Sequence, residues 1–347
     1  MKNNSLFPCR PSLVTCHLSL VTCRLSLVPC RLLLVAFLVA CCLSLSGGLL
    51  YSAGGVGTTS ATFLKIGVGA RNIAMGETGA ASEDVNSVYW NPAGLNSLTG
   101  KEVSLMHAVW LDDINFEHAA AGYPTKYGTF GLGLNYLSMN PIQEYDVNDT
   151  KLGTTYKPYD AAGTISYART VYGVPLGVNV KYIYEKIDTE RAWAVAGDVG
   201  CAYDGIEVMG QKLRLGAVVQ NIGTKVKFVS VGDDLPLNVK FGGSYSFINS
   251  EPNYLLAAVD INIPSDNKAR LGVGAEYTRK LGNNIFVSAR AGYKTNTEGL
   301  SAISGVTAGA GFRYDGYTVD YAWVPYRSDD GFSDLGDTQR ISLGIKW

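Results

Sequence analysis

From Glu102 to the C-terminus, hydrophobic and polar side chains alternate with a period of two residues. In the stretch 178–185 valine and tyrosine alternate with mostly polar residues, and the stretches 271–278, 285–294 and 306–313 repeat this pattern. Such alternation predicts strands with one apolar and one polar face. We place about fourteen strands, starting near Glu102, Asn115, Tyr127, Ala161, Leu176, Ala192, Lys212, Leu237, Asn253, Lys268, Asn284, Ile303, Tyr317 and Gln339.

The intervals between these strands are alternately short and long. The tight intervals are 124–126, 170–175 and 280–283, and the long, polar ones are 141–160, 223–236, 295–302 and 325–338. A soluble β-sandwich also alternates, but outer-membrane barrels combine short periplasmic turns, longer outer loops and aromatic residues at strand ends. An even number of strands leaves both termini on the periplasmic side. The predicted fold class is all-β, a transmembrane antiparallel β-barrel of about 14 strands.

The C-terminal residues ISLGIKW predict a final strand of a particular kind. Ile341, Leu343, Ile345 and Trp347 share one face, and the sequence stops on the aromatic residue. This arrangement resembles the C-terminal signal by which assembly machinery recognises outer-membrane barrels. We therefore expect these four residues to act as an assembly signal, with the barrel assembly machinery and outer-membrane lipid as partners.

Residues 54–101 are rich in glycine and small residues and alternate far less. In the run NSVYWNPAGL at 86–95, Pro92 fixes its own backbone and disfavours helix at Asn91, while Gly94 permits conformations closed to other residues. A barrel of more than about eight strands has a lumen that its own side chains do not fill. We expect 54–101 to be a hatch inside a barrel at 102–347. The motif that anchors this hatch is Tyr89, Trp90, Asn91, Pro92, Ala93 and Gly94, with both aromatic residues packed on the inner wall.

Residues 1–53 form a different kind of sequence, which we interpret as a leader. Residues 12–32 contain three near-identical heptads, SLVTCHL, SLVTCRL and SLVPCRL, and the lack of acidic partners favours translated repetitive DNA over a coiled coil. Behind them, a positive flank, a short apolar core and small residues are typical of a secretory signal peptide. The stretch LVAC at 38–41 also resembles a lipoprotein cleavage box, with Cys41 as the lipidated residue.

The composition narrows the range of functions. Charged residues make up 17% of the chain, below the usual quarter of a soluble domain, which fits a surface that does not face water everywhere. The formal net charge of −1 gives no basic footprint for nucleic acid. Six of the seven cysteines lie in the leader and only Cys201 remains, so neither a disulfide framework nor a cysteine metal site is expected.

The sequence argues against catalytic histidines and against a nucleotide-binding loop. His107 and His118 stand in or beside the first two strands, where lone histidines are usually structural. Three Gly-X-Gly pairs mimic part of a nucleotide loop, but each lies inside a strand with no helix after it. Glycines there are expected to relieve crowding on the lumen face. These pairs are Gly131/Gly133, Gly272/Gly274 and Gly309/Gly311.

The charged candidates also have ordinary explanations. Asp146, Asn148 and Asp149 lack the spacing, glycine and terminal glutamate of a calcium loop. Six charged residues fit the polar lining expected of a lumen; they are Lys181, Glu185, Glu276, Arg290, Lys294 and Arg313. We therefore predict no enzyme activity, no cofactor and no metal.

The expected hatch resembles a known family. The elements Gly69-Ala70-Arg71, Met75-Gly76, Asp84-Val85 and Tyr89-Trp90-Asn91-Pro92-Ala93-Gly94-Leu95 make residues 65–100 similar to the hatch region of FadL-like outer-membrane proteins. The similarity is greatest to the PorV/PorQ branch. The resemblance implies a fourteen-stranded barrel with an N-terminal hatch, located in the bacterial outer membrane.

The resemblance implies two functions of different classes. In the PorV branch, such barrels are similar to a non-enzymatic partner of the type IX secretion system, which collects exported cargo proteins and hands them to a surface attachment complex. In FadL-like transporters, similar barrels pass long-chain fatty acids or other hydrophobic small molecules. The sequence has no long apolar outer loop of the sort that captures fatty acids, so we expect the first function and keep the second as the alternative.

Overall fold

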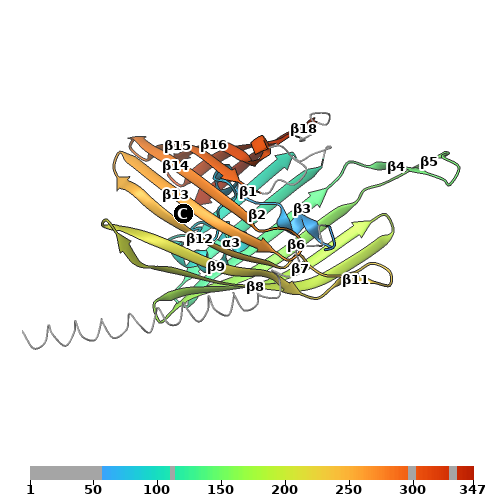
Figure 1. Cartoon of the computed structure of the whole chain (residues 1–347), viewed down its shortest axis with the longest axis horizontal. Helices are drawn as coiled ribbons and strands as arrows, with labels where there is room; N and C mark the ends of the chain where they lie inside the picture. The colour runs from blue at the N-terminus through green and yellow to red at the C-terminus, as the bar shows by residue number, and fades with distance from the viewer. Residues whose placement is uncertain (1–56, 110–113, 296–301, 328–333) are drawn as a thin grey trace, which may run out of the picture.

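The structure, a computed structural model, describes residues 57–109, 114–295, 302–327 and 334–347 (Figure 1). The expected leader, with its repeat, its signal peptide and Cys41, lies outside the described residues. No helix within the described ranges is long and apolar enough to cross a membrane.

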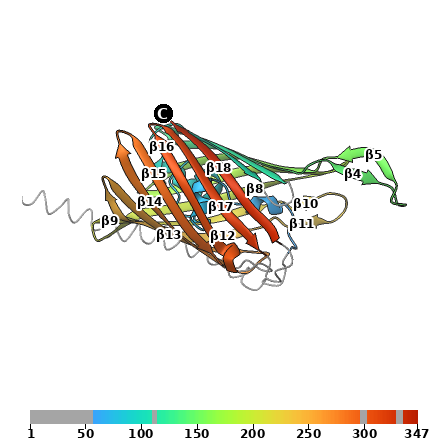
Figure 2. The same ribbon diagram turned by 90° about the horizontal axis from the view of Figure 1, so that it is seen from above.

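Fourteen strands close into one antiparallel barrel, in which β18 pairs back to β1 (Figures 1 and 2). The wall strands are β1 (Glu102–Val109), β2 (Asn115–Thr125), β3 (Gly128–Ser138), β6 (Tyr159–Val171), β7 (Val174–Ile187), β8 (Glu190–Val208), β9 (Gln211–Gly223), β12 (Asn238–Ser250), β13 (Asn253–Pro264), β14 (Arg270–Gly282), β15 (Ile285–Lys294), β16 (Val306–Tyr314), β17 (Tyr317–Arg327) and β18 (Asp334–Lys346). The predicted fold class is confirmed. The largest shift in a strand start is at β18, which begins at Asp334 rather than near Gln339.

The two faces of the wall follow the predicted alternation. On β7, Val180 and Tyr182 are 59% and 53% exposed, whereas Lys181 between them is buried. Most of the expected lumen-facing charges are buried in the same way, and Arg313 lines a cavity in the lumen. Lipid-facing positions of an outer-membrane barrel are apolar and lumen-facing ones polar, so this register fits a wall that crosses a bilayer.

The two ends of the barrel differ. At the turn end, tight turns join consecutive strands, as where Thr125 pairs with Gly128. At the loop end, a hairpin of β4 (Ile142–Tyr145) and β5 (Lys151–Tyr156) and a ribbon of β10 (Val226–Lys227) and β11 (Gly232–Asp233) extend away on the same side (Figures 1 and 2). One loop-end connection, between β7 and β8, is itself a tight turn.

Residues 57–101, called here the N-terminal segment, contain four short helical elements. They are η1 (Thr62–Lys65), α2 (Ala70–Ala74), α3 (Ser87–Trp90) and η2 (Pro92–Ser97); a further 3-10 helix, η4 (Ala302–Gly305), precedes β16. The Ala70 amide donates to Ser342 Oγ of β18 (2.8 Å), and Asn179 Nδ2 of β7 donates to the Val88 carbonyl (2.8 Å). Because β18 and β7 lie across the barrel from each other, the segment spans the lumen between them.

The main apolar clusters lie between this segment and the wall. One cluster joins Ile73 and Trp90 of the segment to Phe116 and Val324 of the wall, and another joins η1 to Ile183. Burial of apolar surface stabilises by roughly 25 cal/mol per Å², so these contacts hold the segment strongly. The buried core of the molecule therefore sits in the lumen.

The segment begins at one end of the barrel and finishes at the other. Its first residues contact Asp234 and Asp266, which lie in loops at the loop end. At the turn end, Lys101 and Trp347 hydrogen-bond each other's backbones. The two ends of the wall therefore lie together, as expected of an even number of strands, whereas residue 57 lies at the opposite end of the barrel.

Candidate functional site

The motif at residues 89–94 lies where α3 ends and η2 begins. Asn91 has an extended backbone (φ −159°, ψ 107°), and Pro92 occupies the first position of η2. Proline suits that position because the first turn of a helix has no partner for its N–H groups, and it disfavours helix in the residue before it. The Asn-Pro pair thus stops one short helix and starts the next.

The Asn91 side chain ties three pieces of chain together. Its Oδ1 accepts a hydrogen bond from the Ala93 amide (3.1 Å), which caps η2. Its Nδ2 donates to the carbonyls of Ala80 (2.7 Å) and Cys201 (3.1 Å), the latter on wall strand β8. The side chain is fully buried, so each of these bonds satisfies a group that water cannot reach.

The two aromatic residues of the motif have different surroundings. Trp90 is 2% exposed, its Nε1 donates to the Val68 carbonyl (3.0 Å), and Lys240 Nζ of β12 lies 4.1 Å from its ring centroid. Tyr89 is half-buried, stands edge-on to Trp90, and donates its hydroxyl to the Leu64 carbonyl (3.0 Å). Trp90 therefore contacts both the wall and the rest of the segment, whereas the Tyr89 hydroxyl bonds within the segment.

Wall glycines give the segment room to approach the strands. A Cβ on Gly177 would lie 2.3 Å from the Ala93 amide nitrogen, closer than real Cβ atoms come. The Gly-X-Gly pairs singled out above show the same close approach: a Cβ on Gly131, Gly133, Gly272, Gly274 or Gly309 would lie 2.8 Å or less from an atom of the segment. At these five positions the absence of a side chain serves close packing against the segment.

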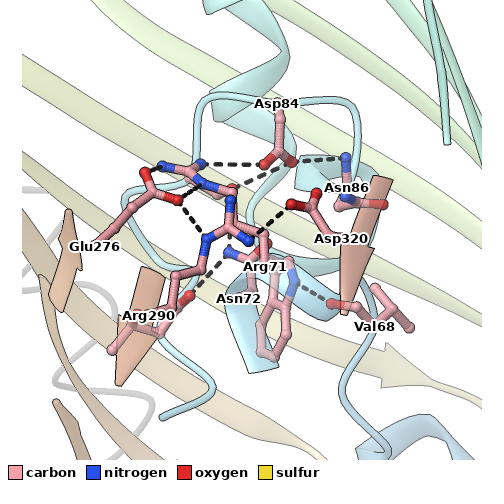
Figure 3. A network of polar contacts seen from close by, with 11 residues as sticks. Val68, Arg71, Asn72, Asp84, Asn86, Glu276, Arg290 and Asp320 are labelled. Carbon is pink, nitrogen blue, oxygen red and sulfur yellow. Dashed lines mark hydrogen bonds and ion pairs between the residues drawn. The ribbon is translucent and has the colours of Figure 1, made fainter. Parts of the chain in front are cut away.

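A network of charged side chains joins α2 to the wall (Figure 3). Arg71 binds Glu276 of β14 through two nitrogens, with Nη2–Oε1 at 2.7 Å and Nε–Oε2 at 2.9 Å, and reaches Asp84 at 3.4 Å. Arg290 of β15 also binds Glu276, and its Nη1 lies 2.7 Å from Asp320 of β17. The negative charge of Glu276 raises the pKa of Arg71 further above its usual range. Two guanidinium groups thus pair with three carboxylates in a mostly buried place.

Two more ion pairs hold the first part of the segment. Lys294 Nζ of β15 lies 2.7 Å from Glu77 Oε1. Burial raises the pKa of Glu77, but the charges of Lys294, Arg270 and Arg340 outweigh this effect and lower the pKa to about 2. At the loop end, burial likewise raises the pKa of Asp266, yet hydrogen bonds from Lys65 and Thr59 leave it below its usual value.

A cavity of about 500 Å³ lies on the turn side of the charged network. Arg71, Glu276, Arg290 and Asp320 form its inner end, and residues of the β16–β17 turn lie at its other end. Its lining mixes charged, hydroxyl and aromatic side chains, which suits water and polar solutes better than a hydrocarbon.

The structure places the other candidate catalytic and metal-binding residues of the sequence apart from one another. His107 faces outward beside Glu117 (2.7 Å), while His118 is buried on the lumen side with Asn135 (2.6 Å), so the two histidines do not form a pair. Asp146 accepts hydrogen bonds from the amides of Asn148 and Thr150 and so stabilises the β4–β5 turn. Across the described ranges, no group of three or more His, Cys, Asp or Glu side chains is placed to hold a metal ion.

The C-terminal residues lie at the closure of the barrel. Ile341, Leu343 and Ile345 are exposed on the outward face of β18, and β18 pairs with both β17 and β1. The Trp347 backbone bonds that of Lys101. Their role as an assembly signal stays a prediction.

Sequence reasoning missed several residues that hold the segment. Arg71 was noted only as part of a motif, and Glu276 and Arg290 only as lumen lining, yet the three form one network. Gln220 was not noted at all, although its Nε2 donates to the Tyr89 carbonyl (2.7 Å). The one available signal was the placement of charged and amide side chains on the lumen face of strands, which indicates a buried partner but not its identity.

The fold is similar to that of solved aromatic-hydrocarbon transporters. The toluene transporter TodX of Pseudomonas putida matches with a TM-score of 0.52 and 13% identity, over 81% of this chain and 97% of its own. The CymD monoaromatic hydrocarbon channel matches with a TM-score of 0.50 and 12% identity, over 81% of this chain and 96% of its own. At such identities the likeness shows the fold alone.

Among curated proteins, a UPF0164 protein of Treponema pallidum (strain Nichols) is 24% identical over 159 residues. The match covers 43% of this chain and 40% of the relative, so the chain spans well under half the length of that relative.

A family model matches the larger part of the chain. The model of the type IX secretion system protein PorV matches residues 53–266, which is more than half of the chain and includes the N-terminal segment and the wall strands from β1 to β13. The resemblance to PorV is thereby confirmed, and family and barrel fold together indicate the outer membrane. The protein therefore belongs to the PorV family of type IX secretion system proteins.

Proposed function

We propose that the protein is a closed outer-membrane barrel that acts as a non-enzymatic partner of a type IX-type secretion and surface attachment system, with the N-terminal segment as its hatch. The observation that supports this most is the way the segment fills the lumen, by ion pairs on one side and close packing on the other. A hydrophobic solute passing through would have to break pairs such as Arg71–Glu276, which is costly in a buried place.

Exposed apolar side chains at the loop end support protein contacts. The β4–β5 hairpin exposes Tyr145, Val147 and Leu152, and the β10–β11 ribbon exposes Val229 and Val231. These loops lie beyond the wall, where outer-membrane barrels face water, so lipid does not cover them. Apolar side chains in such a place are typical of surfaces that bind other proteins, here secretion-system components or exported cargo.

A second function, the binding of a small hydrophobic solute, is favoured by one feature. An apolar cavity of about 170 Å³ lies in the wall and is lined by residues of β8, β9 and β12, including Cys201, Leu215 and Phe241. A protein cavity of about 150 Å³ with apolar walls binds benzene. Since the toluene transporter TodX shares the fold, a monoaromatic hydrocarbon is the solute to test.

Crosslinking in outer membranes of the native host, followed by isolation of the protein, tests the proposed partner role. We expect exported proteins and secretion components to be recovered, and Tyr145→Ser to reduce that recovery several-fold because it removes an exposed loop-end ring. Tyr172→Ser is the matched control, since Tyr172 is also an exposed tyrosine but lies at the turn end. Recovery of no exported protein, together with toluene binding that Ala217→Trp abolishes, would favour the second function instead.

A further inference from the structure

The N-terminal segment starts at the loop end of the barrel. Ser60 donates from its amide to the Asp234 carbonyl (3.0 Å) and from its hydroxyl to Glu185 Oε2 (3.0 Å). Asp266, which is almost wholly buried, pairs with Lys65 (2.6 Å) and accepts a hydrogen bond from Thr59. Asp234 and Asp266 belong to loops before β12 and β14, and Glu185 is near the loop end of β7. Three separate loop-end positions thus hold residues 59–65.

The segment leaves the lumen at the opposite end. Asn96 Nδ2 donates to the Leu176 carbonyl (3.2 Å), close to the turn between β6 and β7. The amides of Lys101 and Trp347 each donate to the other's carbonyl (3.0 Å), and β1 starts at the next residue, Glu102. Between these ends, α2 and α3 bond lumen-facing residues of the wall. Residues 57–101 therefore start at the loop end of the barrel and finish at its turn end.

We infer that the N-terminal end of this segment is displayed on the outer face of the membrane, although the first wall strand begins on the periplasmic side. Outer-membrane barrels place short turns in the periplasm and longer loops outside, which makes the loop end external. Gly57 and Thr58 are exposed there. Residue 57 therefore lies on the cell exterior, on the same side as the β4–β5 hairpin.

This inference places residues 57–60, together with the loops that carry Asp234 and Asp266, on the external face of the protein. It depends on the path of the chain and on the orientation of the barrel, so it holds for a secretion partner and for a solute-binding barrel alike. A failure of the partner experiment would leave it unaffected.

A peptide epitope inserted between Gly57 and Thr58 tests the inference by antibody staining of intact cells. Matched controls carry the same epitope between Asn148 and Asp149 in the β4–β5 turn, at the loop end, and between Asp315 and Gly316 in the β16–β17 turn, at the turn end. We expect the first two insertions to stain intact cells to a similar degree. The third should stain about tenfold less until the outer membrane is permeabilised, because periplasmic turns are shielded.

The mobility of each variant in unheated gels shows whether its barrel is folded. If the insertion at residue 57 prevents folding, Thr58→Cys takes its place, with a membrane-impermeant maleimide as reagent and the unsubstituted chain as the blank for other cysteines. Detection of position 57 or 58 only after permeabilisation, in a host where the position-148 epitope stains from outside, would overturn the inference. External staining of the position-315 epitope would also overturn it, because the barrel would then be inverted.

Discussion

The N-terminal segment is held to the wall in two different ways. Residues 87–98, the neutral half, contain no Asp, Glu, Lys, Arg or His and dock on strands β6 to β9 through close packing and amide hydrogen bonds. Residues 65–77, the charged half, place three ionised side chains against opposite charges on β14, β15 and the loop before β14. One short segment thus combines a packed attachment with an ionic one.

The difference indicates which half can be released. Close packing responds to changes of volume, and pH and salt affect it little, although Lys240 of the wall places a charge beside the Trp90 ring. A buried ion pair depends on both partners being present and ionised, and the loss of either leaves an uncompensated charge. We therefore expect the neutral half to be the fixed anchor and the charged half to be the part that conditions or partners can loosen.

Removal of the Trp90 ring should have the largest effect. Trp90→Ala deletes a buried side chain that packs against both the segment and the wall, which should cost about 3–5 kcal/mol of segment docking. Hydrogen exchange of amides in residues 57–101 should rise, while the wall strands stay protected. Trp193→Ala is the matched control, since Trp193 lies exposed on β8 and should leave exchange unchanged. Equal exchange in both variants would mean that Trp90 does not anchor the segment.

Loss of Arg290 should loosen the charged half more than the neutral half. Arg290→Met breaks the bonds to Glu276 and Asp320 and should cost about 3 kcal/mol, near the lower limit for breaking a buried pair, because Arg71 still binds Glu276. Exchange in α2 should increase more than in η2. Arg313→Met serves as the control. Arg313 lines the same cavity, but its loss removes a contact over the Phe286 ring rather than an ion pair. Uniform loosening of both halves would contradict the division.

Added volume beneath the neutral half should have a smaller effect. Gly177→Ala places a methyl group against Ala93 and Pro92 and should cost about 1–3 kcal/mol by overpacking. The effect on exchange in η2 should be the same at low and high salt. Gly163→Ala, with no atom within 4 Å of the new Cβ, controls for the substitution itself. A salt-dependent effect of Gly177→Ala would show that charge also holds this half.

Acid should weaken the docking of the charged half alone. This weakening should be slight as long as the pH stays above about 4. Its pairing holds the pKa of Glu77 at about 2, below the usual value of 4.5, so ionised Glu77 stabilises the docked segment above about pH 4.5. This stabilisation is lost progressively as pH falls from about 4.5 towards 2. Amide exchange in α2, corrected for the intrinsic effect of pH, should rise over this range, and Glu77→Gln should reduce the dependence, the remainder coming from the other paired carboxylates, Asp266 and Glu276. A matching rise in η2 would contradict the comparison.

The wall could be predicted from the sequence because its signals are local. Alternation on β7 distinguished outward Val180 from inward Lys181, and the lengths of the intervals distinguished the two ends of the barrel. The alternation was less informative at Cys201 and Ala217, which occupy outward positions but are buried. The pairing of β8 with β9 shifts register between Tyr203 and Ile206, and such a bulge redirects the strand.

The contacts of the lumen could not be predicted, because their partners are far apart in the sequence. Arg71 and Glu276 are separated by 205 residues, and Glu77 and Lys294 by 217. Alternation shows that Glu276 faces the lumen, but it does not say which residue it meets there. The direction of the segment likewise depends on loops near Asp234 and Asp266 that only the folded barrel brings to its first residues.

The central claim is that the N-terminal segment closes the barrel as a hatch, and planar-bilayer conductance tests it most directly. Purified wild-type protein and Trp193→Ala should conduct little, whereas Trp90→Ala should show a clear rise in small-ion conductance because the loosened segment opens the lumen. If Trp90→Ala loosens the segment in exchange measurements and its conductance remains that of the wild type, the segment does not close the lumen and the claim is wrong.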